Sequence, residues 1–294
     1  MNGIWLSLTR PLDPWLDRLL RDLDDLLQSR NIPYLLAGGM AREILLYYGH
    51  GFDRGRATTD VDLGVTLSSW DEYEALKQAM VGSGLFRQDP KQVQRMIHRN
   101  PESRVETRVD LVPFGDIAGP TGKLAWPPDG SHVMRVLGYA QALSTAIRLR
   151  LDETRWVPMA SASGLAMMKL VAWSDNGEAR LGRDAVDFVE ILSQYVRILS
   201  DEELYDGYPE AMEHYDFRAD PAAAWVLGRQ VAELADGPLR MVFRDAVQPE
   251  SRIRMINHYL KERGFQGIDD REAEAALLLD AFAEGLASYD SNNH

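Results

Sequence analysis

The chain has 294 residues, 45% of them hydrophobic and 26% charged, which is typical of a globular protein and excludes a disordered or fibrous one. It has no cysteine, so disulfides, thiolate metal sites and cysteine nucleophiles are excluded. The formal net charge of −13 disfavours broad, sequence-independent binding of nucleic acid, which needs lysine and arginine to neutralise phosphates.

The first half of the chain alternates between strand and helix signals. In chain order, these signals predict a helix over 15–27, a strand over 33–37, a helix over 40–48, a strand over 60–67, a helix over 70–82, and strands over 108–114, 146–151 and 156–160. The strand signals are short apolar or alternating runs, and the helix signals are apolar residues three or four positions apart.

The second half has helical periodicity almost throughout. Helices are predicted over 165–173, 183–199, 222–235, 251–263 and 271–287. We therefore expect an α/β (α+β) protein with a small mixed β-sheet head and flanking helices over 1–160, followed by a helical domain over 161–294. The sequence has no leader pattern and no run of about 18 apolar residues, so we expect a cytoplasmic protein that does not enter a membrane.

A glycine pair, Gly38 and Gly39, separates the predicted strand 33–37 from the helix that follows. Glycine lets the backbone approach a ligand, and the free N–H groups at a helix start favour an anion such as a phosphate. A tight connection between strand and helix would also use glycine, so the pair alone does not establish a site.

Two aspartates, Asp60 and Asp62, occupy one face of the predicted strand 60–67 because side chains alternate along a strand. Carboxylates so close together repel unless a cation lies between them. Mg²⁺ suits a few carboxylates combined with substrate phosphates, and Mn²⁺ can take its place. By itself, an Asp-x-Asp pattern is more often a solvated strand end.

A third carboxylate, Asp110, lies on the polar face of the alternating segment 108–114. If the two strands are neighbours, three carboxylates converge, which is the set that two-metal phosphoryl transfer uses. Asp116 is a second candidate, although its surroundings are typical of a turn. The sequence therefore predicts a catalytic, metal-binding group of Asp60, Asp62 and Asp110.

One stretch of this acidic chain is rich in cations. Its members are Arg87, Lys91, Arg95, His98, Arg99, Arg104 and Arg108. The stretch is either a basic patch for an RNA or a solvated helix and loop, and the sequence leaves the two interpretations open.

Four ordered motifs resemble a known family. Leu36-Ala-Gly-Gly-Met-Ala-Arg-Glu and Arg56-Ala-Thr-Thr-Asp-Val-Asp-Leu are similar to the glycine-pair and Asp-x-Asp signature of the DNA polymerase β-like nucleotidyltransferase superfamily. The AbiEii/AbiGii-toxin-like group matches best, since it also has helical strings similar to Gly164-Leu-Ala-Met-Met-Lys-Leu-Val-Ala-Trp and Arg183-Asp-Ala-Val-Asp-Phe-Val-Glu-Ile-Leu. The resemblance spans residues 33 to 195.

The resemblance implies roles for particular residues. It implies that metal is bound by Asp60, Asp62 and Asp110 and that phosphates lie against Gly38 and Gly39. The further nucleotide-binding residues that it implies are Arg42, Arg56, Thr58, Lys169 and Asp184. One departure is Met40, because many members of the superfamily have a serine or threonine after the glycine pair.

The function that these motifs imply is transfer of a nucleoside monophosphate from an NTP to a hydroxyl of RNA, such as tRNA, or of a protein, with release of pyrophosphate. The family resemblance also implies a toxin or phage-defence setting and a cognate antitoxin. The alternatives are a catalytically silent binding module with the same fold, as one half of a two-component system, and a metal-dependent phosphohydrolase. Retention of all three acids argues against the silent module, and the six scattered histidines argue against the hydrolase.

Overall fold

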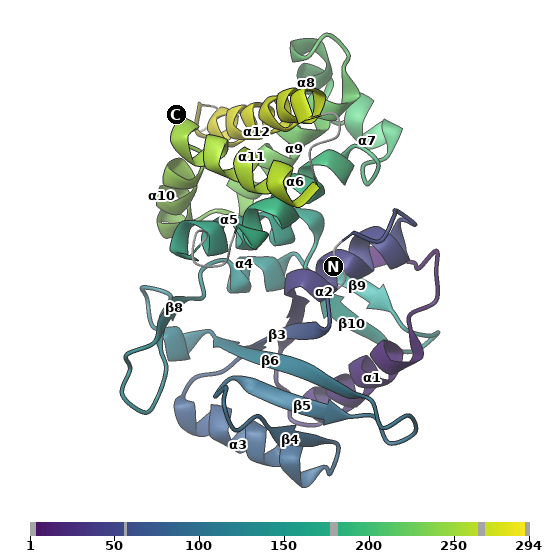
Figure 1. Ribbon diagram of the computed structural model, residues 1–294, viewed down its shortest axis with the longest axis vertical. Helices are drawn as coiled ribbons and strands as arrows, with labels where there is room; N and C mark the ends of the chain where they lie inside the picture. The colour runs from purple at the N-terminus through teal and green to yellow at the C-terminus, as the bar shows by residue number, and fades with distance from the viewer. Residues whose placement is uncertain (1–3, 56–57, 177–181, 264–267, 292–294) are drawn as a thin grey trace. The chain divides into compact units, whose positions relative to one another are not determined.

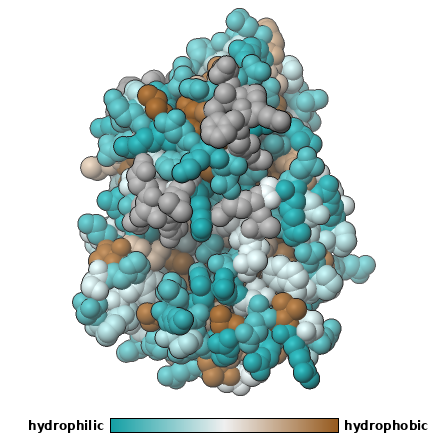
Figure 2. Space-filling model, in the orientation of Figure 1, coloured by the Kyte–Doolittle hydropathy of each residue, from teal (hydrophilic) through white to brown (hydrophobic). Residues whose placement is uncertain are grey.

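The computed structural model describes residues 4–55, 58–176, 182–263 and 268–291 (Figure 1). The chain divides into two compact units, Met1–Ser161 and Ala162–His294. The first unit is built around a mixed sheet with helices, and the second is helical, which confirms the expected α/β class. Hydrophilic side chains cover most of the face drawn in Figure 2, and the exposed apolar residues are scattered among them.

The sheet of the first unit has eight strands and mixes parallel with antiparallel pairs. In the order in which they lie side by side, the strands are β1 (Trp5–Leu6), β9 (Ile147–Arg150), β10 (Trp156–Met159), β2 (Tyr34–Ala37), β3 (Asp60–Thr66), β6 (Glu106–Phe114), β5 (Arg95–Arg99) and β4 (Phe86–Gln88). The pairs β1–β9, β10–β2 and β3–β6 are parallel, and the other pairs are antiparallel. A separate hairpin consists of β7 (Lys123–Ala125) and β8 (Val133–Arg135).

The five strands predicted from alternation all occur, with ends that differ by a few residues. The cation-rich stretch, in contrast, is not a helix and loop: much of it forms the strands β4 and β5. In β5 the buried residues Met96 and His98 alternate with Arg95 and Arg99, so this strand has an apolar face that its high charge concealed.

The helices of the first unit lie between its strands in the sequence. They are α1 (Pro14–Gln28), α2 (Gly38–Glu43), which continues as the π-helix η1 (Ile44–Gly49), α3 (Trp70–Gly82), the 3₁₀ turn η2 (Asp116–Ala118) and α4 (Tyr139–Ser144). The leucine stripe of α1 is buried, as its helical spacing predicts. The Tyr34 hydroxyl donates a 2.7 Å hydrogen bond to Asp24, and Nε2 of His98 lies 2.8 Å from Asp22, so α1 covers one face of the sheet.

The second unit consists of eight helices in the part of the chain that the structure describes. They are α5 (Ala162–Asn176), α6 (Arg183–Tyr195), α7 (Asp201–Tyr205), α8 (Pro209–His214), α9 (Ala219–Leu234), α10 (Gly237–Ala246), α11 (Pro249–Arg263) and α12 (Ile268–Ser291). Helices α9 and α12 touch through their backbones, because a Cβ on Gly228 would lie 2.1 Å from the carbonyl oxygen of Phe282. Among the helices of the described residues, none is both long and apolar enough to cross a membrane.

Candidate active site

The predicted carboxylates occupy one row across the sheet. Asp62 on β3 is the register partner of Asp110 on β6 and of Ala37 on β2, the last residue before the glycine pair. Register partners point to the same face, and Asp60 lies two residues before Asp62, so all three carboxylates share a face. The expected neighbourhood of the two strands is therefore present.

An arginine extends this row by one strand. Arg95 on β5 is the register partner of Asp110 and donates two hydrogen bonds to its carboxylate, at 2.7 and 2.8 Å. Its Nη2 also lies 3.8 Å from Asp60, whose other oxygen is 3.4 Å from Nη1 of Arg108. The hydrogen bonds to Asp110 raise the pKa of Arg95 above its ordinary value, so this guanidinium is a permanent cation among the acids.

The glycine pair brings the backbone against the acids. Gly38 has a φ of +67°, and a Cβ at this position would lie 1.8 Å from Oδ2 of Asp62. Only glycine combines this conformation with so close an approach. A Cβ on Gly39 would lie 3.2 Å from the Thr58 hydroxyl oxygen, so this hydroxyl lies beside the turn.

The loop between α2 and β3 is anchored by Glu43. One of its carboxylate oxygens accepts a 3.1 Å hydrogen bond from the backbone N–H of Thr58, and the other accepts a 2.7 Å bond from Nε of Arg54. Glu43 is 5% exposed, and the hydrogen bond that its carboxylate accepts raises the pKa of Arg54. These two residues position Thr58 beside the glycines, and no motif in the sequence pointed to Arg54.

Three predicted residues of this region have other surroundings. Arg42 is 2% exposed and Met40 is fully buried, so both side chains lie in the interior and not on the surface of the turn. The Met40 side chain therefore does not occupy the position from which a hydroxyl would face a phosphate. Arg56 lies outside the residues that the structure describes.

The second unit contains a buried ionic group that includes Lys169 and Asp184. The Lys169 ammonium lies 2.9 Å from Asp184 and 2.7 Å from Asp187. The side chain of Lys169 is 12% exposed, and those of the two aspartates are 4% and 1% exposed. Burial lowers the pKa of Lys169, but the two carboxylates outweigh it and raise the pKa above its ordinary value. Asp187 was missed in the sequence, although it follows Asp184 by three residues and thus shares its helix face.

The carboxylates of the sheet site differ in arrangement from a complete cation site. In the described segments, no three Asp, Glu or His side chains gather closely enough to hold a metal ion. The donor chemistry nevertheless fits Mg²⁺ or Mn²⁺, because the row offers carboxylate oxygens only. The difference from the expected trio is Arg95, whose guanidinium already neutralises Asp110.

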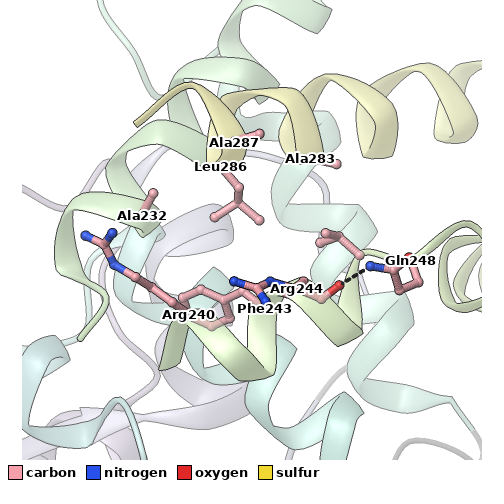
Figure 3. A pocket seen from close by; sticks show the side chains of 9 residues that line it. Ala232, Arg240, Phe243, Arg244, Gln248, Ala283, Leu286 and Ala287 are labelled. Atoms are coloured by element: carbon pink, nitrogen blue, oxygen red, sulfur yellow. Dashed lines mark hydrogen bonds between the residues drawn. The ribbon is translucent and has the colours of Figure 1, made fainter. Parts of the chain in front are cut away.

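A cavity of about 210 Å³ lies in the second unit between α9, α10 and α12 (Figure 3). Its lining is Ala232, Arg240, Phe243, Arg244, Val247, Gln248, Ala283, Leu286 and Ala287. The walls are mainly apolar, and no carboxylate or imidazole is among these residues. The cavity therefore lacks the groups that metal-assisted phosphoryl transfer requires.

The sheet site defines a class of protein. Its mixed sheet carries Asp-x-Asp on one strand and a third aspartate in register on the parallel neighbour, with a glycine turn against them. This is the arrangement of a nucleotidyltransferase head. Residues 18–284 match the family model "Nucleotidyl transferase AbiEii toxin, Type IV TA system". The chain belongs to this AbiEii family, so the resemblance drawn from its motifs is confirmed, and the chain is a nucleotidyltransferase. No curated protein matches the sequence.

Some solved structures resemble the chain. An antigenic nucleotidyltransferase-like protein from Paracoccidioides brasiliensis is 20% identical, with a TM-score of 0.44, over 71% of this chain and 94% of that one. ANT(2")-Ia in complex with adenylyl-2"-tobramycin is 13% identical, with a TM-score of 0.35, over 80% and 99%. The CCA-adding enzyme of Thermotoga maritima, complexed with tRNA, is 12% identical, with a TM-score of 0.24, over 95% and 83%.

Proposed function

We propose that the protein transfers a nucleoside monophosphate from an NTP to a hydroxyl of an RNA, such as tRNA, or of a protein. The acceptor oxygen attacks the α-phosphorus, the bond from that phosphorus to the bridging oxygen of the β-phosphate breaks, and pyrophosphate leaves. The observation that carries the proposal is the register of Asp62 with Asp110, beside Gly38 and with Asp60 on the same face.

The three aspartates would hold Mg²⁺ or Mn²⁺. When bound, the cation neutralises the triphosphate and lowers the pKa of the attacking hydroxyl. Asp60 and Asp62 would provide the shared ligands, and Asp110 would ligate the cation next to the acceptor or take up its proton. Arg95 has to loosen its hold on Asp110 for this role, because its two hydrogen bonds occupy both carboxylate oxygens.

The glycine turn would hold the phosphates of the NTP. Gly38 brings the backbone close to the acids, and the Thr58 hydroxyl beside Gly39 can donate a hydrogen bond to a phosphate oxygen. Thr58 would thus supply the hydroxyl that many members of the superfamily carry at the sequence position of Met40. For Arg42 the burial favours a supporting role beneath the turn.

Lys169 and Asp184 are proposed to serve the nucleotide as one unit with Asp187. A lysine held between two buried carboxylates has a fixed position, and a phosphate that binds it has to displace one of these carboxylates. The family also supports a toxin whose activity a cognate antitoxin opposes. We expect the protein to act in the cytoplasm.

The proposal is tested by incubating the purified protein with Mg²⁺ and each α-labelled NTP, in the presence of tRNA or of a protein acceptor. The Asp60→Ala/Asp62→Ala variant should lose the transfer of label by a factor of about 10³ or more, because the cation loses both shared ligands. Asp116→Ala removes an exposed carboxylate nearby in the chain and should leave the transfer unchanged. Equal labelling by wild type and double variant, or no labelling in any condition, would contradict the proposal and favour a silent binding module.

A further inference from the structure

Two tryptophans and two arginines form a surface on β1, β9 and β10, the three strands at one edge of the sheet. Trp5 lies on β1, Arg148 and Arg150 on β9, and Trp156 on β10. The Arg148 guanidinium is 4.5 Å from the ring centre of Trp156 and 5.4 Å from that of Trp5, and the Arg150 guanidinium is 4.7 Å from that of Trp5. We call these four residues the Trp–Arg surface.

The Trp–Arg surface is open to solvent and its charges are not neutralised. Trp5 is 43% exposed, Arg150 is exposed, and Arg148 and Trp156 are half-buried. Neither arginine forms an ion pair or a side-chain hydrogen bond with any residue that the structure describes. The chain as a whole has a net charge of −13, whereas these two arginines without a carboxylate partner make this surface locally positive.

The strand register places this surface on the same face of the sheet as the carboxylates. Met159 is the partner of Leu36, which is the partner of Leu63, so these three residues share one face. Asp62 is adjacent to Leu63 and therefore points to the opposite face. Trp156 lies three residues before Met159 and also points to the face opposite to it. Trp156 and Asp62 therefore point to the same side.

The other members follow by register. Arg150 is the partner of Trp156, and Trp5 is the partner of Arg148, which lies two residues before Arg150. From β3, strand β10 is the second neighbour and β1 the fourth. Trp156 is level with Thr66 and Arg148 with Gly64, so at about 4.8 Å between strands and about 3.3 Å per residue along them the surface lies about 16–20 Å from Asp62.

We propose that the Trp–Arg surface binds a single-stranded segment of a nucleic-acid acceptor, with bases stacked on the tryptophans and phosphates paired with the arginines. The proposal rests on the nucleotidyl transfer proposed above and names the class of its acceptor. Stacking and cation–phosphate pairing together are how proteins hold single strands without reading sequence. A duplex would not serve, because its bases already stack on one another.

The distribution of charge favours this surface over the cation-rich stretch that the sequence singled out. In that stretch Arg87 and Arg99 both pair with Glu106, Arg95 pairs with Asp110, and His98 is fully buried. At Arg87, Arg95 and Arg99 a phosphate would have to displace carboxylates. At the Trp–Arg surface it meets arginines without such competitors.

The experiment measures binding of a fluorescein-labelled 12-nucleotide single-stranded RNA to the full chain by anisotropy, without NTP or divalent metal. The Arg148→Gln/Arg150→Gln variant should bind at least about tenfold more weakly. Its salt dependence should be weaker, with the slope of log K against log salt closer to zero by about 1.4. Trp156→Leu should also weaken binding by about tenfold. Arg87→Gln is the matched control, because it removes an arginine that a carboxylate already neutralises.

Arg148→Lys/Arg150→Lys keeps the charge and loses the planar stacking, so it should bind between wild type and the glutamine variant; it keeps the test valid if that variant fails to fold. A DNA of the same sequence tells which kind of strand is preferred, and a duplex RNA should bind more weakly than the single strand. Equal RNA affinity in wild type and both arginine variants, no binding by wild type, or labelling of protein acceptors alone would overturn the proposal. Absence of label transfer together with RNA binding that depends on the Trp–Arg surface would count against the proposed function and not against this surface.

Discussion

Arg95 is the residue whose replacement tests the electrostatics of the site most directly. Its guanidinium lies between Asp110 and Asp60 and contacts both carboxylates. Replacement by glutamine keeps much of the side-chain volume and removes the charge. We expect Arg95→Gln to lower the stability of the metal-free protein and to raise its affinity for a divalent cation.

The size of the stability loss follows from the geometry. The two hydrogen bonds at 2.7 and 2.8 Å join side chains that are 20% and 17% exposed, and charge-assisted bonds of this kind contribute about 1.5–3 kcal/mol to stability. The aspartates repel one another with or without Arg95, so the loss of these bonds sets the size of the change. The free energy of unfolding should therefore fall by about 1.5–3 kcal/mol.

The same numbers set the expected change in metal affinity. If a cation must break the pairing of Arg95 with Asp110, the about 1.5–3 kcal/mol of that pairing opposes metal binding in the wild type. Its removal should tighten Mn²⁺ binding by about 10- to 150-fold, since each 1.4 kcal/mol corresponds to a factor of ten. Isothermal titration with Mn²⁺ measures this directly, and denaturation in EDTA and in Mg²⁺ measures the stability.

The control is Arg87→Gln, which breaks an exposed pair with Glu106 and should change stability by less than about 1 kcal/mol. Arg95→Lys keeps a cation but cannot form both hydrogen bonds, so its stability should be intermediate. The reasoning would be refuted by an Arg95→Gln variant as stable as wild type in EDTA, or by one whose Mn²⁺ affinity is unchanged or weaker.

Three further predictions concern other parts of the structure. Gly38→Ala should cost about 1–3 kcal/mol of stability and at least about tenfold in transfer rate, because its Cβ meets Asp62; Gly84→Ala, with a positive φ but open space, is the control in thermal melts and transfer assays. Lys169→Met should destabilise the protein by about 3–5 kcal/mol, because two buried carboxylates lose their counter-charge, and additional replacement of both by asparagine should restore stability in urea titrations. Burial lowers the pKa of His98, although its carboxylate partner opposes this shift. The unfolded state therefore binds more protons than the folded state as the pH falls below about 6.5, and the free energy of unfolding should decrease there by at most about 1.4 kcal/mol per pH unit. The His98→Gln variant should show a shallower pH dependence in thermal melts from pH 5 to 8.

The sequence predicts the strand containing Asp60 and Asp62 and the strand containing Asp110, because their apolar residues alternate with polar ones. It also predicts the turn at Gly38. It does not predict the register that makes Asp62 the partner of Asp110, since a shift of one residue between the strands would leave both patterns intact. The convergence of the carboxylates was therefore a conditional prediction until the pairing was known.

The strands β4 and β5 were missed for a different reason. Two of the five residues from Arg95 to Arg99 are arginines and a third is His98, and a charge density of this kind is typical of a solvated segment. Their charge is accommodated because Arg95 meets Asp110 and Arg99 meets Glu106 across the sheet. Partners 15 and 7 residues away in the chain, joined by antiparallel pairing, leave no local signal.

The charges of the chain also limit how an acceptor can bind. A net charge of −13 repels the body of a polyanion, and the repulsion is screened only beyond about 8–10 Å at physiological salt. Two unneutralised arginines on the Trp–Arg surface can pair with about two phosphates, which corresponds to a salt slope of about 1.4. An acceptor held in this way engages the protein through a short single-stranded end and keeps its remaining phosphates away from the acidic surface. A terminal hydroxyl on such an end lies within a few nucleotides of the bound bases, which is compatible with the about 16–20 Å between this surface and Asp62.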